Sequence, residues 1–245
     1  MKKIILVLLI IFNVSCCKED DTALVCLSDC TVVQGHIVTA EGKPLGNVPI
    51  EFRYNSSRPY SSSVRRIKKA ITDENGYYNM EFFIESDELG SEAKGYFELI
   101  IDYSKLDGKV YMNNSPFYDI TISPINRRDT TITMDFYNPR KAYITVNLKG
   151  FNPEVEEDYF WVSSLYPSGL KIGQNEFLNS EYQLAYDGNR FYATSTETKI
   201  DSILVAESDY NLISISKRKN GGSVEDEYHE VYVPKNSKLE LTYDY

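Results

Sequence analysis

The chain has 245 residues, of which 42% are hydrophobic and 25% are charged, an ordinary composition for a globular protein. That length is sufficient for two sandwich domains of about 100 residues each. The formal net charge of −10 argues against a nucleic-acid partner, because no overall positive field exists to attract phosphates.

The amino terminus has the organisation of an export signal. Lys2 and Lys3 precede a nine-residue apolar run, 4–12, which suits a secretory signal and is too short for a membrane span. The following Ser15-Cys16 junction resembles a bacterial lipobox. We therefore expect residues 1–15 to be a lipoprotein signal peptide and Cys16 to be acylated, for example with palmitate. Cys17 is the alternative lipidation site.

The residues behind Cys16 bear on the location of the protein. Lys18 followed by the acids 19–21 resembles the export tag of Bacteroidota-type surface lipoproteins. The resemblance implies a protein anchored by lipid to the outer membrane and exposed on the cell surface. An ordinary cleaved signal with an acidic spacer is the alternative.

Residues 16–30 are expected to form an acidic tether that contains Cys26 and Cys30. In an exported, oxidising setting, a disulfide is the default for such a pair. The intervening segment must curl into a turn, because an extended chain would hold the two cysteines too far apart. A zinc site is the alternative, and it lacks ligands because the only nearby imidazole is His36. The disulfide would pin the start of the first strand.

The stretch 33–84 has the period-2 alternation of half-buried β-strands, interrupted by turn residues at 41–44 and 73–76. The alternating apolar residues are Val33, Ile37, Val48, Ile50, Phe52, Tyr78, Met80, Phe82 and Ile84. Gly42 and Gly76 occupy positions where such turns need a positive φ.

The same stretch carries a family resemblance. Its landmarks are Gly35-x-Ile37, Gly42-x-Pro44-Leu45, Val48-x-Ile50 and Thr72-Asp73-x-x-Gly76-x-Tyr78-x-Met80. They resemble the carboxypeptidase regulatory-like module over residues 31–138. The resemblance implies a seven-stranded, transthyretin-like (prealbumin-like) β-sandwich, and alternating segments at 97–103, 118–122 and 132–136 supply the remaining strands.

One segment of this first domain departs from the acidic character of the chain. Residues 53–69 contain six basic side chains and no acid, and the serines and proline of its first half predict a loop. Arginine can hold carboxylate or phosphate bidentately. Arg58, Arg65 and Arg66 are therefore candidate contacts for an acidic glycan or a lipid phosphate. The alternative is a solvated loop whose charges offset acidic neighbours.

Residues 139–245 predict a second β-sandwich, of immunoglobulin-like type. The predicted strands are 142–148, 159–161, 182–186, 190–196, 202–206, 211–216, 228–233 and 239–243. Gly221-Gly222 is a hairpin turn signal, and the last two strands are expected to pair as a closing hairpin. The predicted fold class is therefore all-β, with two β-sandwich domains.

The sequence lacks the catalytic and nucleotide-binding motifs of several common enzyme classes. His36 and His229 do not supply the His-x-x-Glu spacing of a metallocarboxypeptidase, and nucleophile-elbow, P-loop and dinucleotide motifs are absent from the sequence. Asp73 and Asn75 precede Gly76 as in a calcium loop, but the later bidentate acid is missing, which favours a plain turn. We expect no catalysis, cofactor or metal, and a solvated acidic loop at 154–158.

Three functional hypotheses follow. The leading one is a surface-anchored lipoprotein that acts as a non-catalytic binding or structural module of the cell envelope. A pilin-like or envelope-complex assembly subunit would require a detachable terminal strand or an open groove. A glycan-binding accessory of a polysaccharide-uptake system would require exposed aromatics, for which Tyr159 and Trp161 are candidates. Core packing is the alternative role for such strand aromatics.

Overall fold

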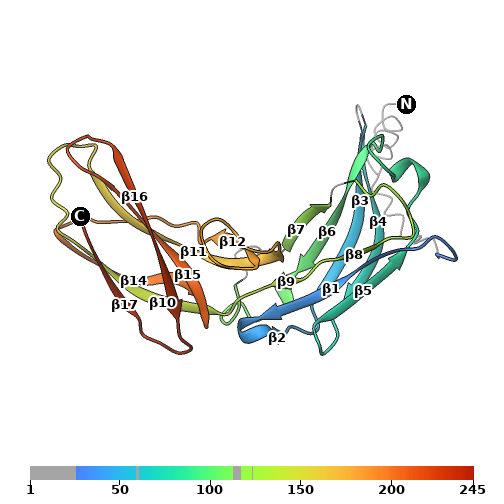
Figure 1. Cartoon of the computed structure of the whole chain (residues 1–245), viewed down its shortest axis with the longest axis horizontal. Coiled ribbons are helices and arrows are strands. Elements are labelled where there is room, and N and C mark those ends of the chain that lie inside the picture. The colour runs from blue at the N-terminus through green and yellow to red at the C-terminus, as the bar shows by residue number, and fades with distance from the viewer. Residues whose placement is uncertain (1–25, 59–60, 113–116, 123) are drawn as a thin grey trace, which may run out of the picture.

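The computed structural model describes residues 26–58, 61–112, 117–122 and 124–245, and the side chains of 57, 58, 61 and 62 lie outside this description. The fold is all-β, as predicted. Two β-sandwich lobes, residues 31–137 and 141–245, are joined end to end in an arch (Figure 1).

The first lobe packs two sheets face to face. One sheet has the order β4-β3-β6-β7, and in the other β1 lies between antiparallel β5 and parallel β8 and β9, while β2 pairs with the end of β1. The strands are β1 (Thr31–Thr39), β2 (Lys43–Pro44), β3 (Pro49–Arg58), β4 (Ser61–Ile71), β5 (Tyr77–Phe82), β6 (Gly95–Asp102), β7 (Phe117–Ile122), β8 (Thr131–Thr133) and β9 (Phe136–Tyr137). Three short 3-10 turns are η2 (Ala40–Gly42), η3 (Ser86–Glu88) and η4 (Tyr103–Lys105).

Alternating apolar residues fill the space between these sheets. The ring of Phe52 in β3 lies 4.7 Å from that of Phe82 in β5 and 5.5 Å from that of Phe97 in β6, centroid to centroid. Full burial of each such ring stabilises the fold by roughly 2–3 kcal/mol. Tyr78 is also buried, which raises its pKa, and its hydroxyl donates a 2.8 Å hydrogen bond to the Met134 carbonyl. This bond ties β5 to the segment between β8 and β9.

The second lobe is a smaller sheet, β14-β10-β17, packed against β16-β15-β11, with β12 and β13 both pairing with β11. Its core contains Ile144, Val146, Phe160, Val162, Ile203, Ile213 and Ile215. The strands are β10 (Lys141–Lys149), β11 (Tyr159–Lys171), β12 (Tyr182–Tyr186), β13 (Phe191–Tyr192), β14 (Glu197–Ala206), β15 (Asp209–Arg218), β16 (Val224–Val233) and β17 (Glu240–Asp244).

Two sequence predictions for this lobe are wrong. The expected closing hairpin does not form, because β17 crosses to the other sheet and runs parallel to β10 while β16 pairs with β15. The crossing lets Leu241 and Tyr243 pack on the core. The strand predicted at 190–196 is only two residues long, because the Thr198 hydroxyl accepts the N–H groups of Thr194 and Ser195 and turns the chain.

One sheet runs through both lobes. β9 lies between β1 and β11, so that Tyr137 is opposite Val38 on one side and Gly169 on the other. Leu170, from the second lobe, packs on the core of the first. The chain passes between the lobes at 138–140, next to the predicted boundary, but the sheet's backbone pairing continues across this junction.

Candidate functional site

The cysteines fall in different parts of the description. Cys16 and Cys17, the predicted lipidation sites, lie outside the described residues. Cys26 and Cys30 form a disulfide, with 5.6 Å between their Cα atoms, immediately before β1 begins at Thr31. The disulfide therefore sits where it constrains the entry to the first strand.

In the part of the chain that the structure describes, no helix has the length and apolar character needed to cross a membrane.

The basic segment 53–69 is a β-hairpin and not the predicted loop. β3 and β4 pair along its length, with Tyr54 directly opposite Arg65. Residues opposite each other share a face of the sheet, and Tyr54 faces the core, so Arg65 lies on the inner face. There its guanidinium forms two hydrogen bonds with Glu88, one of them Nε to Oε1 at 2.7 Å.

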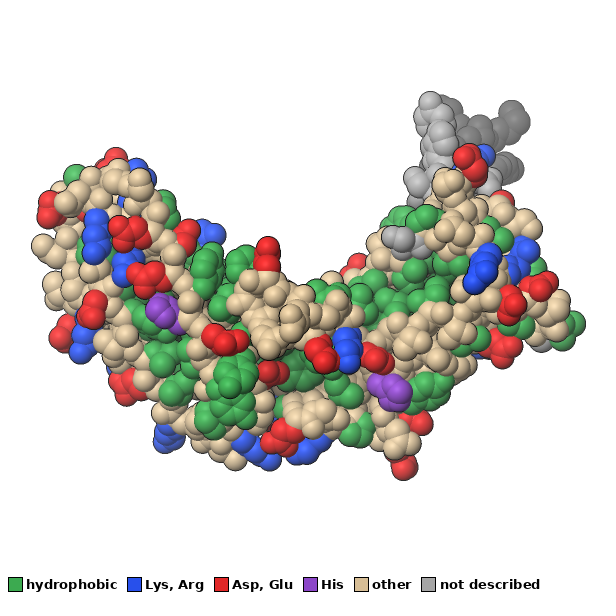
Figure 2. All heavy atoms as spheres, viewed as in Figure 1, with side chains coloured by type: hydrophobic (Ala, Val, Ile, Leu, Met, Phe, Trp, Pro, Cys, Tyr) green, Lys and Arg blue, Asp and Glu red, His purple; other side chains and the backbone are tan. Residues whose placement is uncertain are grey.

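Two further arginines of the hairpin are also paired. On the outer face, Arg66 Nε lies 3.0 Å from Glu51 Oε1, and Arg53 Nε lies 2.6 Å from Glu98 Oε2. The Arg58 side chain lies outside the description. The protein's own carboxylates thus lie against Arg65 and Arg66, so the predicted loop is wrong, while contact of these arginines with an external anion stays a prediction. Figure 2 shows no basic patch on the visible face, where charges of both signs are scattered.

The candidate metal and acidic residues have structural roles. Asp73 Oδ1 accepts the N–H groups of Asn75 and Tyr77, at 2.9 and 2.8 Å, and so forms the expected turn. Asp158, predicted to be solvated, is instead buried and accepts three backbone N–H groups. His36 is exposed beside Tyr77 and Asp135. Among the described residues, no cluster of three or more His, Cys, Asp or Glu is arranged to hold a metal.

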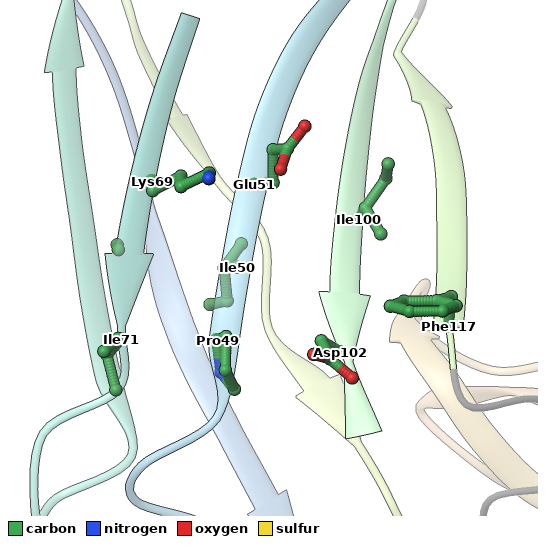
Figure 3. Close-up of a pocket in the computed structure, with 9 residues that line it drawn as sticks. Pro49, Ile50, Glu51, Lys69, Ile71, Ile100, Asp102 and Phe117 are labelled. Atoms are coloured by element: carbon green, nitrogen blue, oxygen red, sulfur yellow. The ribbon is translucent and has the colours of Figure 1, made fainter. Parts of the chain in front are cut away.

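One hollow, of about 620 Å³, lies on the outer face of the β4-β3-β6-β7 sheet. Figure 3 shows Lys69 and Glu51 at one end and Asp102 and Phe117 toward the other. Its charged groups do not converge on one point, and its remaining lining is aliphatic. The geometry therefore offers a shallow apolar surface and no focal polar group.

A second hollow, of about 230 Å³, combines aromatic and polar groups on the outer face of the second lobe's larger sheet. We call it the aromatic groove and define it by Trp161, Ser163, Leu165, Phe177, Tyr186, Arg190, Leu212, Ser214 and Tyr228. It contains one of the two aromatic residues singled out from the sequence. Tyr159 lies on the same strand but outside the groove.

Strand register produces the shape of the aromatic groove. Ser163 of β11 is opposite Ser214 of β15, which is in turn opposite Tyr228 of β16. The two serines are only 3% and 5% exposed and form the floor, because their side chains are too short to rise above the sheet. Tyr186 is paired with Leu165 one row along. Small floor residues between large wall residues leave a depression.

The walls of the groove are exposed rings. Tyr228, Phe177 and Tyr186 are 51%, 51% and 43% exposed. Phe177 comes from the β11–β12 connection, and its ring centroid lies 5.6 Å from that of Tyr228. Asn175 Oδ1 accepts the N–H groups of Phe177 and Leu178, which fixes this connection in a turn. The Phe177 wall is thereby held in place before any ligand binds.

Polar groups are available inside the groove. In the described part of the chain, neither the Ser163 nor the Ser214 hydroxyl has a hydrogen-bond partner. Arg190 lies over the indole of Trp161, with its guanidinium carbon 4.9 Å from the ring centroid. The groove therefore offers apolar ring faces, two hydroxyls and a guanidinium to a ligand.

Sequence analysis identified Trp161 but not the rest of the groove. The other large side chains of the groove come from separate segments, which strand order brings together; they are Phe177, Tyr186, Arg190 and Tyr228. The sequence predicted a strand at 159–161 and named Trp161 as a candidate aromatic, but it indicated nothing about the residues around it. The other groove residues are far apart in the sequence, and no sequence pattern indicates that they lie close together in the fold.

Comparison with protein-family models and with curated proteins finds no match. Similar solved structures include a streptococcal ancillary pilin, at 10% identity and TM-score 0.30, covering 89% of this chain and 63% of that one. The Bacillus anthracis TIE protein has 8% identity and TM-score 0.27, with 88% and 33% covered. Shaft pilin SpaA from Lactobacillus rhamnosus GG has 14% identity and TM-score 0.28, with 88% and 96% covered. This chain thus spans less than two thirds of the first two proteins.

Proposed function

We propose that this chain is a non-catalytic binding module of the cell envelope and that it binds glycan in the aromatic groove. The observation that carries the proposal is the pairing of exposed aromatic walls with an open serine floor. A sugar ring has an apolar C–H face, which packs on aromatic rings, and hydroxyls, which hydrogen-bond to side chains such as serine. The groove offers both kinds of contact side by side.

The lining of the groove supports binding without catalysis. Ser163 and Ser214 supply hydroxyls, but no histidine or carboxylate lines the groove to take a proton from them. A serine nucleophile needs such a base within hydrogen-bond reach. The structure of the site is therefore suited to holding a ligand unchanged.

Glycan binding is tested by comparing two aromatic-to-alanine variants on a glycan array and then by calorimetry. Trp161→Ala removes a ring from the aromatic groove, and the expected result is loss of at least tenfold in affinity, or roughly 1.4 kcal/mol. Tyr143→Ala is the matched control, because Tyr143 is an exposed ring on β10 of the opposite sheet. Equal binding by wild type and Trp161→Ala contradicts the proposal.

The anchor forms the second part of this proposal. Lipid on Cys16 would hold both lobes at the outer-membrane surface, and the Ser15-Cys16 junction after the apolar run supports it. Metabolic labelling with a fatty acid should mark the wild type and not Cys16→Ala. Labelling that disappears only in Cys17→Ala moves the site by one residue, and an unlabelled wild type excludes lipidation.

An assembly subunit that works by strand exchange is the second candidate function. β17 favours it, since this strand is five residues long, lies at a sheet edge and, among the strands that the structure describes, pairs only with β10. A peptide of residues 238–245 should then bind protein lacking that strand, and should displace the strand from intact protein. Failure of the peptide to bind, together with a monomer at all concentrations in light scattering, excludes strand exchange.

A further inference from the structure

Building on the proposed glycan function, we infer that the ligand of the aromatic groove is an anionic glycan, whose carboxylate or sulfate pairs with Arg190. Arg190 is exposed and stacks on Trp161, and it forms no ion pair with any described carboxylate. Its positive charge therefore faces the groove without an anion.

Four other arginines of the chain have the carboxylate partner that this position lacks. Arg53, Arg65, Arg66 and Arg140 each lie within ion-pair distance of a glutamate. Such pairing is readily available in a chain with 36 acidic and 26 basic residues. Arg190 instead lies over the indole of Trp161, with its guanidinium carbon 4.9 Å from the ring centroid, and a planar guanidinium can hold a carboxylate or sulfate through two of its N–H groups.

The acids near the groove do not cancel this charge. Asp226 and Glu230 flank Tyr228 on the outer face of β16. β16 is two strands away from β11, so the backbone of these two residues lies roughly 10 Å from that of β11. Salt weakens a repulsion over such a distance, because the screening length is about 8 Å at physiological salt. A direct contact with Arg190 is weakened less.

The loop residues beside the walls are also acidic. Glu176 precedes Phe177 and is exposed, while Asp187 belongs to the turn that leads to Arg190. Asp187 Oδ1 already accepts the N–H of Asn189, and burial raises the pKa of its carboxyl, so its charge is costly in this position. Neither residue lines the groove. The one charge on the lining is that of Arg190.

The geometry further sets how the ligand lies. Because Arg190 lies over the indole, a sugar that pairs with the guanidinium lies beside Trp161, and the next sugar of the chain extends over the serine floor toward Tyr228. Sugar–aromatic stacking supplies affinity irrespective of charge, and Arg190 supplies the preference for an anionic residue.

The test compares polygalacturonate, which carries carboxylates, dextran sulfate, which carries sulfates, and neutral pullulan, by affinity electrophoresis and calorimetry. Wild type should bind at least one of the two anionic polymers at least tenfold more tightly than pullulan, and rising salt should weaken only the anionic interaction. The polymer that binds identifies carboxylate or sulfate as the preferred anion.

Variants separate this inference from the proposed function. Arg190→Gln should weaken anionic binding about tenfold and leave any weak pullulan binding unchanged. Lys199→Gln removes the same charge on β14 of the opposite sheet and should have no effect. Trp161→Ala should weaken binding of every polymer that the wild type binds.

Each remaining outcome is decisive. Anionic binding that survives Arg190→Gln but not Trp161→Ala overturns the role of Arg190 and leaves the glycan function standing. If the wild type prefers pullulan, the inference that the ligand is anionic is wrong, but the proposed glycan function still stands. Wild type that binds no glycan in this test or on the array contradicts the proposed function, and the inference fails with it.

Discussion

The hydroxyl of Tyr118 in the first lobe donates a hydrogen bond to Gln183 Oε1 in the second lobe, at 2.6 Å, and accepts a second from the N–H of Leu170 at 3.3 Å. β7 and β12 thus meet at the middle of the arch (Figure 1). Together with the sheet that continues through β9, these contacts fix the angle between the lobes.

Tyr118→Phe should therefore loosen the junction without removing the ring from its place beside Phe136. We expect a loss of about 1 kcal/mol in the free energy of unfolding and a wider range of lobe angles. Urea denaturation and small-angle X-ray scattering measure the two effects. Tyr143→Phe, at an exposed site on β10, is the control, and equal scattering by both variants would refute the role of Tyr118.

At Gly35, the backbone of β1 lies directly against the segment between its parallel neighbours β8 and β9. A Cβ at Gly35 would lie 1.8 Å from the Met134 carbonyl oxygen, which is backbone and cannot move aside. Gly35→Ala should cost about 3 kcal/mol or prevent folding. Gly42→Ala is the comparison: Gly42 has a φ of +67°, but a Cβ there would meet nothing within 4 Å, so it should cost only about 1 kcal/mol. Thermal unfolding by circular dichroism distinguishes the two, and equal melting temperatures contradict the prediction.

The ion pair of Arg65 and Glu88 stabilises the inner end of the β3–β4 hairpin. The side chains are 18% and 5% exposed, so removing one leaves the other charge poorly solvated. Arg65→Ala should cost roughly 3 kcal/mol, whereas the double substitution Arg65→Met, Glu88→Leu should cost much less. A double-mutant cycle by urea unfolding provides the measurement.

The surface pair Lys199 and Asp201 is the control for that cycle, because both side chains are more than half exposed. Its coupling energy should stay below about 1 kcal/mol. A coupling for Arg65 and Glu88 as small as that of the surface pair would show that the hairpin does not depend on its buried charges.

Asp158 should make stability depend on pH in the acid range. Burial by itself raises the pKa of this carboxyl, but the N–H groups of Gly221, Glu154 and Val155 outweigh it and hold the pKa below its usual value. Because the pKa of Asp158 is lower in the folded protein than in the unfolded chain, its ionised carboxylate stabilises the fold fully at neutral pH. This stabilisation is lost as the pH falls through the folded pKa. Asp158→Asn should therefore lower stability at pH 7 and flatten the decline below about pH 4.

Unfolding measured in urea between pH 7 and pH 3 tests this dependence. Glu156→Gln, at an exposed position of the same connection, is the matched control and should keep the wild-type profile. If the stability of Asp158→Asn changed with pH in parallel with that of the wild type, the three hydrogen bonds would not favour the charged carboxylate over the protonated carboxyl.

Local patterns were sufficient to predict most strands and turns. The alternation through Tyr78, Met80 and Phe82 is a property of adjacent residues, and so is the Gly221-Gly222 turn between β15 and β16. These features depend on backbone geometry within a few residues, and the sequence contains all the information needed for them.

Which strands become neighbours was decided only by the tertiary structure. Nothing local distinguishes a β17 that pairs with β16 from one that crosses to β10, because burial of Leu241 and Tyr243 depends on the opposite sheet. Likewise, the sequence predicts an available charge at Arg65, but folding brings Glu88, 23 residues away, against it.

The aromatic groove arises in the same way: Trp161 was visible in the sequence, whereas Tyr228 and Arg190 reach it only because strand order places distant segments on one face. Ion pairing and groove shape are properties of long-range proximity, which residue alternation along one strand does not encode.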